Sequence, residues 1–214
     1  LQRKPTVLYA QGVGQLAAAP NRWLVRHTLN RCRVITVRDP LSRERLRAAG
    51  VTRPIEVTAD CAFSLRPAPR SDAQAILAKE GVASGRPRVG VTLRPWRGFD
   101  AWPVLSAFAD RCVTEQGVTI VFVPMHSGRD DAVLAQVHAG MRHRDAAVHL
   151  RGDYSPGQVK AILGELELVV GMRMHSLIFA AGMEVPMVGL GYMDKVRSFM
   201  DIVGLPGDYL ALEE

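Results

Sequence analysis

Cysteine, lysine and aromatic residues are scarce in this 214-residue sequence, and long apolar runs are missing. The three cysteines, Cys32, Cys61 and Cys112, are odd in number and widely spaced, which suits neither a disulfide framework nor a zinc site and is typical of a reducing compartment. No apolar run approaches the roughly 18 residues that a transmembrane helix requires. These absences predict a cytoplasmic protein without a membrane span.

Arginine supplies most of the positive charge. Only four of the 27 basic residues are lysines, and 21 acidic residues leave a net charge of +6. Arginine binds carboxylates and phosphates through paired hydrogen bonds, which fits an anionic partner; the alternative is a composition that simply prefers arginine. The arginines are spread along the chain and aromatic residues make up only 6%. We therefore expect no nucleic-acid partner, because no basic and aromatic platform is visible.

Short apolar runs alternate with amphipathic segments along nearly the whole chain. We expect strands at residues 6–10, 34–37, 55–58, 89–93, 118–123, 146–150, 168–170 and 186–190. Helices, counted with the expected caps Asn21 and Ser155, are predicted at residues 21–31, 42–49, 73–80, 101–116, 130–141, 155–166, 175–182 and 194–203. Continuous apolar strands alternating with helices predict an α/β fold, with parallel sheets covered by helices on both faces.

A proline-rich polar stretch, RPAPRSD at residues 66–72, interrupts this alternation and is typical of a linker. We expect the C-terminal part of an incomplete Rossmann-like domain at 1–66, a linker with a connecting helix at 67–85, and a second Rossmann-like domain at 86–214. No element is expected in the last stretch, 205–214, and the chain reads as a fragment of a longer protein. Two such units predict a cleft lined by the carboxyl ends of strands, where open α/β sheets bind ligands.

Two strand ends of the first unit carry candidate site residues. Gly12 and Gly14, with Ala17 three positions on, formally fit the dinucleotide fingerprint G-x-G-x-x-A. Asp39 would then be the acid that binds the ribose. The alternatives are a glycine loop whose N–H groups bind an anion and a simple packed turn. Arg38 directly follows the second strand, where it either faces the cleft or pairs with Asp39.

Further candidates follow two strands of the second unit. Arg94 either points into the cleft or lies in a surface loop anchored by Trp96. His126 follows the next strand, and Asp130 and Asp131 behind it are expected in the first turn of a helix, where the helix dipole favours acids. Since no set of metal ligands surrounds His126, we predict neither a metal site nor a cofactor.

The segment GMRMHSL, residues 171–177, is the most informative strand end. It places Arg173 and His175 at a helix N-terminus, whose partial positive charge disfavours cations unless an anion fills the site. Lys195 follows the next strand, beside another helix start. The three cationic groups therefore predict one anion-binding pocket; the alternative is a neutral His175 in the core with Arg173 on the surface.

These segments resemble the polysaccharide pyruvyl transferase (CsaB-like) family. The similarity is carried, in this order, by LYAQGVGQL, TVRDPLSRERLRAAGV, VTADCAF, LVVGMRMHSLIFAAGMEVPMVGLGYMDKV and FMDIVG. It implies a two-domain fold like that of GT-B glycosyltransferases. It also implies transfer of the pyruvyl group of phosphoenolpyruvate to a sugar of a cell-wall or exported polysaccharide, with release of phosphate. The sugar acceptor can be lipid-linked, which would bring the protein to the inner face of the membrane.

By similarity, Arg173, His175 and Lys195 match family positions of the phosphoenolpyruvate site. Ketal formation needs an acid near neutral pH, so we expect His175 to be the catalytic acid. An additional arginine is implied from the first half, for which Arg38 is the best match and Arg94 the reserve. The whole expected substrate-binding set is Arg173, Lys195, Arg38, Arg94, Ser176, Gly12 and Gly14. Two rival functions share the fold: a glycosyltransferase that uses a nucleotide sugar, and an inactive binding module. The first usually needs a carboxylate for the ribose, and none is well placed in the second half.

Overall fold

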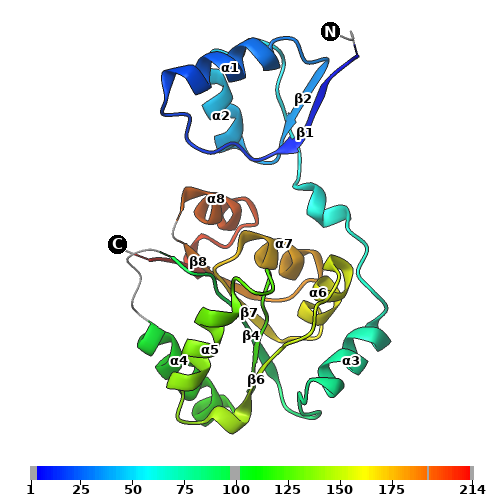
Figure 1. The fold of residues 1–214 in the computed structure, drawn as a ribbon, viewed down its shortest axis with the longest axis vertical. Helices are drawn as coiled ribbons and strands as arrows, with labels where there is room; N and C mark the ends of the chain where they lie inside the picture. The colour runs from blue at the N-terminus through cyan, green and yellow to red at the C-terminus, as the bar shows by residue number, and fades with distance from the viewer. Residues whose placement is uncertain (1–3, 97–101, 192, 213–214) are drawn as a thin grey trace. The chain divides into compact units, whose positions relative to one another are not determined.

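A computed structural model of the protein describes residues 4–96, 102–191 and 193–212. The chain divides into two compact α/β units, Leu1–Ser64 and Leu65–Glu214, each built on a parallel sheet (Figure 1). The predicted fold class is confirmed by these two sheets. The division falls just before the proline-rich stretch, so residues 67–85 belong to the second unit. No described helix combines the length and the apolar character that crossing a membrane requires.

The first unit is a three-stranded sheet in the order β1-β2-β3. Its elements are β1 (Val7–Gln11), α1 (Ala19–Leu29), β2 (Val34–Val37), α2 (Pro40–Ala48), β3 (Glu56–Val57) and the 3₁₀ turn η1 (Cys61–Ser64). Apolar side chains from β2, α2 and the adjoining loops form the core: Cys32, Ile35, Val37, Leu46, Val51 and Ile55. Two parallel strand pairs joined by helical crossovers therefore bring the ends of β1 and β2 together at one edge.

The second unit is a six-stranded parallel sheet with the order β6-β5-β4-β7-β8-β9. Its strands are β4 (Arg88–Thr92), β5 (Thr119–Phe122), β6 (Ala147–His149), β7 (Leu168–Gly171), β8 (Met187–Gly191) and β9 (Tyr209–Ala211). Its helices are α3 (Arg70–Lys79), α4 (Trp102–Gln116), α5 (Asp131–Gly140), α6 (Pro156–Leu163), α7 (Met174–Gly182) and α8 (Asp194–Ile202), with 3₁₀ turns η2 (Arg144–Ala146) and η3 (Pro206–Asp208). Helix α4 packs on α5, while α6, α7 and α8 pack in succession.

The strand order fixes where a ligand can bind in this sheet. The chain starts in the middle at β4, moves outward through β5 to β6, and then returns across the sheet to β7 on the other side of β4. Thr92 at the end of β4 is paired with Gly171 at the end of β7. The loops after these two strands lead to helices on opposite faces, because right-handed crossovers run in opposite directions from this point. Such a switch point leaves a crevice at the carboxyl ends of the strands.

Several boundaries differ from the sequence-based expectation. Helix α3 begins at Arg70, inside the stretch expected to be a linker, and has Asp72 in its first turn. Strand β9 lies where no element was expected, next to β8, and directly follows the turn η3, which contains Pro206 and Gly207. Helix α1 begins before Asn21, with Pro20 in its first positions and no side-chain cap. Pro20 fixes a helical φ at the point where its missing N–H costs nothing, so no capping side chain is required.

Candidate functional site

Arg173 lies in the tight connection between β7 and α7, at the N-cap position of the helix. Gly171, the last residue of β7, makes this connection possible. A Cβ atom there would lie 2.7 Å from Cδ2 of Leu177 and 2.8 Å from Oγ of Ser176. Helix α7 therefore passes directly over the strand end, and a larger residue would push it away. Because Gly171 lets α7 approach the end of β7, Arg173 lies at the switch point.

A buried carboxylate holds the guanidinium group of Arg173. Asp130, which is fully buried, accepts hydrogen bonds from Nε of Arg173 at 3.1 Å and from its Nη2. The same carboxylate accepts the backbone N–H of His126 at 3.0 Å. Two of the five guanidinium N–H groups are thus used, and the remaining three are left for other partners. The side chain of Arg173 is 18% exposed, so a fixed part of the cation can meet an anion.

Two hydroxyl groups hold the backbone of Arg173. Oγ of Ser176 donates a hydrogen bond to the carbonyl oxygen of Arg173 at 2.6 Å. Thr92 of β4 lies 2.6 Å from the same oxygen of Ser176, and must be the donor because Ser176 has given its proton to the carbonyl. Ser176 is fully buried. We expected Ser176 to contact the substrate, but this geometry favours a positioning role beneath the loop.

His175 and Lys195 lie in the first turns of neighbouring helices. His175 is exposed in α7, and Lys195 is half-buried in α8. The two helices follow β7 and β8, which are adjacent parallel strands. Within the described residues, α7 has neither a side chain that caps its N-terminus nor an acid in its first turn. The structure therefore places Arg173, His175 and Lys195 in the segments that follow two neighbouring strands of one unit.

Arg94 lies on the other side of the switch point. It follows β4 by two residues, as Arg173 follows β7, and the last residues of these strands are paired. Arg94 is half-buried, and its guanidinium carbon lies 5.7 Å from the ring centre of Trp96. This cation–π contact orients the arginine at the crevice. Arg94 thus comes from the strand end adjacent to that of Arg173.

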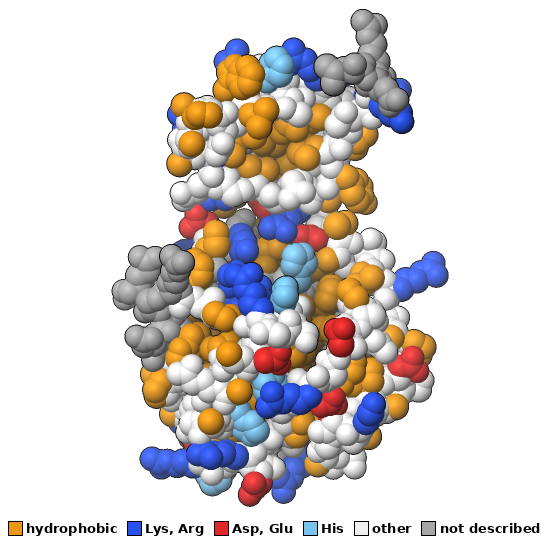
Figure 2. Space-filling view, in the orientation of Figure 1, with side chains coloured by type: hydrophobic (Ala, Val, Ile, Leu, Met, Phe, Trp, Pro, Cys, Tyr) orange, Lys and Arg blue, Asp and Glu red, His pale blue; other side chains and the backbone are white. Residues whose placement is uncertain are grey.

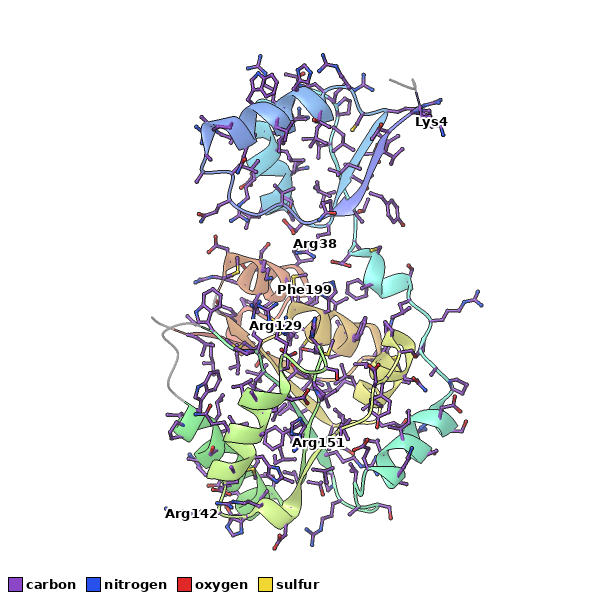
Figure 3. The ribbon with its side chains drawn as sticks, in the orientation of Figure 1. Lys4, Arg38, Arg129, Arg142, Arg151 and Phe199 are labelled. Atoms are coloured by element: carbon purple, nitrogen blue, oxygen red, sulfur yellow. The ribbon has the colours of Figure 1, made fainter. Side chains whose placement is uncertain are left out.

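In the first unit, Arg38 and Gly12 lie against each other. A Cβ atom on Gly12 would lie 2.4 Å from the guanidinium carbon of Arg38, so a larger residue at position 12 would require Arg38 to move. Arg38 (labelled in Figure 3) donates from Nη1 to Asp60 at 2.9 Å, and its Nε lies 3.5 Å from Asp39. The arginine after β2 is therefore fixed by two acids, much as Arg173 is fixed by Asp130. Gly14 shows no such close approach to described atoms.

The glycine loop is tied to α2. The N–H of Val13 donates to Oγ of Ser42 at 2.8 Å, and Arg45 donates to the carbonyl of Val13 at 2.9 Å. Asp39 caps α2 by accepting the N–H of Ser42 at 2.6 Å. The dinucleotide interpretation needs Asp39 for a ribose and a helix opening at Ala17. The structure instead uses Asp39 as a cap and begins α1 at Ala19, which argues against that alternative.

Asp131, the residue after Asp130, pairs with a histidine. Asp131, in the first turn of α5, is 3.0 Å from Nε2 of the buried His149 at the end of β6. Burial lowers the pKa of His149, and the charge of Arg151 lowers it further, against the opposing effect of Asp131. A neutral imidazole then donates from Nε2, while its buried Nδ1 has no hydrogen-bond partner among the described atoms. His126 is exposed, and its Nδ1 lies 3.0 Å from the carbonyl of Ser127.

The role of Asp130 in the structure is larger than the sequence predicts. We expected Asp130 and Asp131 only as acids of a first helical turn, and Asp131 does lie there. Asp130 precedes the helix and makes no side-chain cap to it; its carboxylate binds Arg173 instead. The signal that the sequence offered for this role was an acid placed between a buried strand and the helix after it. Its partner could not be identified from the sequence, because 43 residues separate the two.

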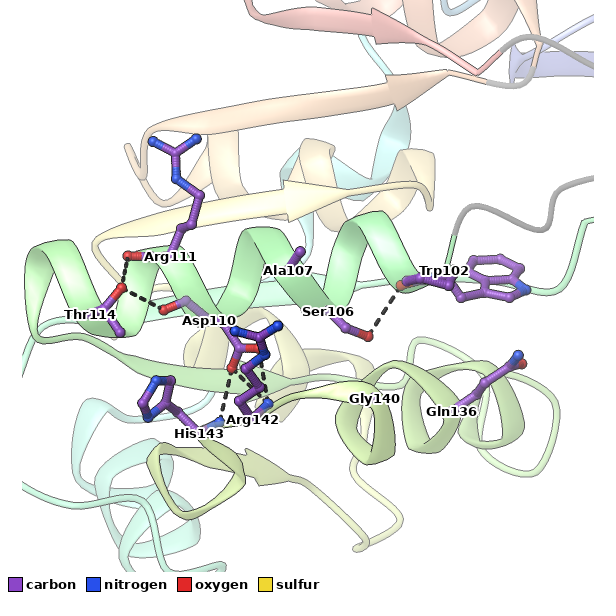
Figure 4. A pocket seen from close by; sticks show the side chains of 11 residues that line it. Trp102, Ser106, Ala107, Asp110, Arg111, Thr114, Gln136, Gly140, Arg142 and His143 are labelled. Atoms are coloured by element: carbon purple, nitrogen blue, oxygen red, sulfur yellow. Dashed lines mark hydrogen bonds between the residues drawn. The ribbon is translucent and has the colours of Figure 1, made fainter.

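A separate hollow of about 630 Å³ lies between α4 and α5 (Figure 4). Its acid, Asp110, is engaged by the N–H groups of Arg142 and His143, both at 2.9 Å. Burial would raise the pKa of Asp110, but these hydrogen bonds lower it on balance. Helix surfaces rather than strand ends line this hollow, so we place no chemistry in it. Among the described residues, no three histidine, cysteine or acidic side chains gather in a way that could hold a metal ion.

Comparison with known proteins identifies similar sequences. The sequence model of the polysaccharide pyruvyl transferase family matches residues 1–194. The amylovoran biosynthesis protein AmsJ of Erwinia amylovora is 21% identical over 225 residues, an alignment that covers 96% of this chain and 54% of AmsJ. The chain therefore spans about half the length of this curated relative.

Solved structures show a similar fold. The UDP-GlcNAc 2-epimerase of Methanocaldococcus jannaschii matches with a TM-score of 0.64 and 12% identity, covering 97% of this chain and 59% of the epimerase. The ADP-heptose lps heptosyltransferase II of E. coli matches with a TM-score of 0.55 and 14% identity, covering 84% of this chain and 56% of the heptosyltransferase. At such identities the likeness shows the fold alone, and that fold is GT-B-like with two parallel-sheet units.

Proposed function

The chain belongs to the polysaccharide pyruvyl transferase family, and from this premise we propose that it binds phosphoenolpyruvate as the pyruvyl donor. The observation that carries the proposal is the constellation of Arg173, His175 and Lys195 at two adjacent strand ends, with Arg173 fixed by Asp130. The acceptor is a sugar of a polysaccharide, and the product is a pyruvyl ketal. Transfer by the whole protein is part of the same proposal.

The anionic groups of phosphoenolpyruvate match the cations and N–H groups at this site. Phosphoenolpyruvate carries a carboxylate and a phosphate, so it needs several cationic or N–H groups in one place. Arg173 has three guanidinium N–H groups beyond those bound to Asp130. The first N–H groups of α7 point away from the helix toward the same strand end. We assign Arg173 and Lys195 to the two anionic groups of the donor.

His175 is proposed as the general acid. Its imidazole can supply a proton near neutral pH, and it is exposed in the first turn of α7. The proton goes to the vinyl carbon of the donor, and a sugar hydroxyl forms a bond to the adjacent carbon and loses its own proton. The proton of this first hydroxyl returns to His175. Phosphate then leaves the carbon with its bridging oxygen, and a second hydroxyl of the sugar bonds to the same carbon, giving its proton to the departing phosphate and closing the ketal. Arg173 and Lys195 stabilise the charge of the departing phosphate.

We assign Arg38 to the additional cation that the family resemblance implies, with Arg94 as the alternative. Arg38 is supported by its fixed orientation above Gly12 and between Asp39 and Asp60. Arg94 is supported by its place beside Arg173 at the switch point. Exchange of each arginine for glutamine removes the charge while keeping a polar side chain. The assigned residue is the one whose exchange weakens donor binding.

Ligand-detected NMR on this chain tests the proposed donor against its rivals. We expect saturation transfer to phosphoenolpyruvate but not to a nucleotide sugar, and we expect Arg173→Ala to weaken the binding of phosphoenolpyruvate. Arg142→Ala is the matched control, since Arg142 is an exposed arginine of the same unit that lines the separate hollow. Binding of a nucleotide sugar without phosphoenolpyruvate would favour a glycosyltransferase. Binding of neither would reject the proposed donor site.

A further inference from the structure

The net positive charge of the protein comes from the first unit. Residues 1–64 contain eleven lysines and arginines against four acids, a net charge of +7. Residues 65–214 contain 16 against 17, a net charge of −1. The first acid of the sequence is Asp39. Such an asymmetry between two parts of one chain indicates a polyanionic partner for the basic part.

Helix α1 carries exposed apolar side chains within this basic unit. None of its eleven residues, all of them described, is buried. Trp23 is 63% exposed and Leu24 is 57% exposed. Trp23 is stacked on His27, one turn further on, with ring centres 5.0 Å apart. Val25 and Leu29 pack against the core of the unit, so the Trp23 side of the helix faces outward. Figure 2 shows hydrophobic, basic and histidine side chains together on the surface over α1.

The arginines on and just after α1 are not neutralised. Within the described part of the chain, Arg22, Arg26, Arg31 and Arg33 form no ion pairs. Arg22 and Arg31 donate side-chain hydrogen bonds to backbone carbonyls instead, as from Arg31 to His27 at 2.6 Å. All four are exposed. These arginines differ from Arg38 and Arg173, whose charges are balanced by buried acids.

We propose that this surface of α1 docks the protein on an anionic lipid bilayer. Tryptophan and leucine beside arginine form the side-chain set of helices that lie in the bilayer interface. Trp23 and Leu24 enter the boundary between headgroups and acyl chains, and the arginines contact lipid phosphates. A neutral polysaccharide is a poorer match, because it offers no negative charge to the arginines. This inference does not depend on the identity of the pyruvyl donor.

Vesicle sedimentation with the 214-residue chain tests the docking surface. We expect binding to vesicles containing phosphatidylglycerol and none to vesicles of phosphatidylcholine alone. Each arginine near the surface contributes about fivefold to binding, so Arg26→Gln with Arg31→Gln should weaken it roughly 25-fold. Trp23→Ser with Leu24→Ser should weaken it as well. The control is Arg129→Gln with Arg142→Gln, which removes the same charge from exposed arginines of the second unit. Equal loss in the control, or no binding to either vesicle, would overturn the proposal.

Tryptophan fluorescence separates bilayer insertion from mere attraction to a polyanion. Trp23 is highly exposed, whereas Trp102 is buried and Trp96 is half-buried. Insertion should therefore shift the emission to shorter wavelength on anionic vesicles, and Trp23→Phe should remove the shift. Dextran sulfate, a soluble polyanion without acyl chains, should produce no such shift. A shift with dextran sulfate equal to that with vesicles would show that α1 recognises polyanions rather than a bilayer. The far-ultraviolet circular dichroism spectrum serves as the folding control for every variant.

Discussion

The carboxylate of Asp130 binds the guanidinium of Arg173 across two loops that follow different strands, β5 and β7. Strand β4 lies between them in the sheet. The pair therefore joins the loops on both sides of the switch point and sets the direction of the cation that we assign to the donor. An acid beside an anion-binding arginine reduces its net charge but removes its freedom to turn, which lowers the entropic cost of binding.

Asp130→Asn tests this pair through stability. The amide keeps the shape of the side chain but leaves Arg173 without its charged partner. We expect a loss of about 1.5–3 kcal/mol in the free energy of unfolding, the range for hydrogen bonds to charged groups. Urea denaturation measures it. Asp130→Asn combined with Arg173→Gln should cost less than the sum of the single exchanges, and strict additivity would show that the two residues are not coupled.

Arg173→Ala should weaken the binding of phosphoenolpyruvate by about 1.5–3 kcal/mol, because a charge-assisted hydrogen bond is lost. Arg173→Lys should not restore the affinity, since an ammonium group cannot bind Asp130 and an anion with the fork of a guanidinium. Isothermal calorimetry measures both. Unchanged affinity in both variants would remove Arg173 from the donor site.

His175→Gln should preserve donor binding but reduce turnover by roughly 100-fold or more, the lower range of general acid catalysis. Glutamine donates a hydrogen bond but does not transfer a proton at neutral pH. The measurement is phosphate release by the full-length protein with a polysaccharide acceptor, alongside calorimetry of donor binding. Turnover within a few-fold of the unaltered protein would mean that the acid lies elsewhere, and His126 would be the next residue to test.

The protonation of His149 should make stability fall in mild acid. Its pKa is lowered by burial in the folded protein, so below an ordinary histidine pKa of about 6.5 the unfolded chain binds the proton more readily. Stability should decrease as the pH falls from about 6.5, by up to about 1.4 kcal/mol per pH unit for one proton. His149→Gln should lose less stability than the unaltered protein between pH 7 and pH 5. Equal losses, measured by urea denaturation at both pH values, would contradict this assignment.

Local patterns predicted most of the architecture. Strand β2 coincides with the expected residues 34–37, and Ser155 caps α6 in a reciprocal capping box with Gln158. These features depend on neighbouring residues, so the sequence displays them directly. Strand β9 escaped prediction because it has only three residues, Tyr209–Ala211, and owes its place to pairing with β8. A short edge strand is stabilised by its neighbour rather than by its own propensity.

The helix start that carries Arg173 and His175 was predictable from the sequence, but the residues that hold Arg173 were not. The GMRMHSL segment placed Arg173 and His175 at a helix start, because that depends only on the order of strand and helix. The contacts that hold Arg173 and its loop depend on how distant segments pack, and no local pattern encodes that packing. They involve Asp130, Thr92 and the inward direction of Ser176. Gly12 was noticed as part of a fingerprint, whereas the structure shows the reason for it: the guanidinium of Arg38 occupies the space of a side chain.

The strand order of the second sheet also has a consequence for biosynthesis. Strand β4 occupies the middle of the sheet, but its partner β7 begins at Leu168, after β5 and β6 and their helices. While a ribosome makes the chain, the inner edge of β4 must wait for β7 with its backbone groups unpaired. Pairing between such distant strands is slow and leaves partly folded chains open to aggregation. A nascent chain that ends before β7 can hold β4, β5 and β6, but it has no crevice to receive an anion.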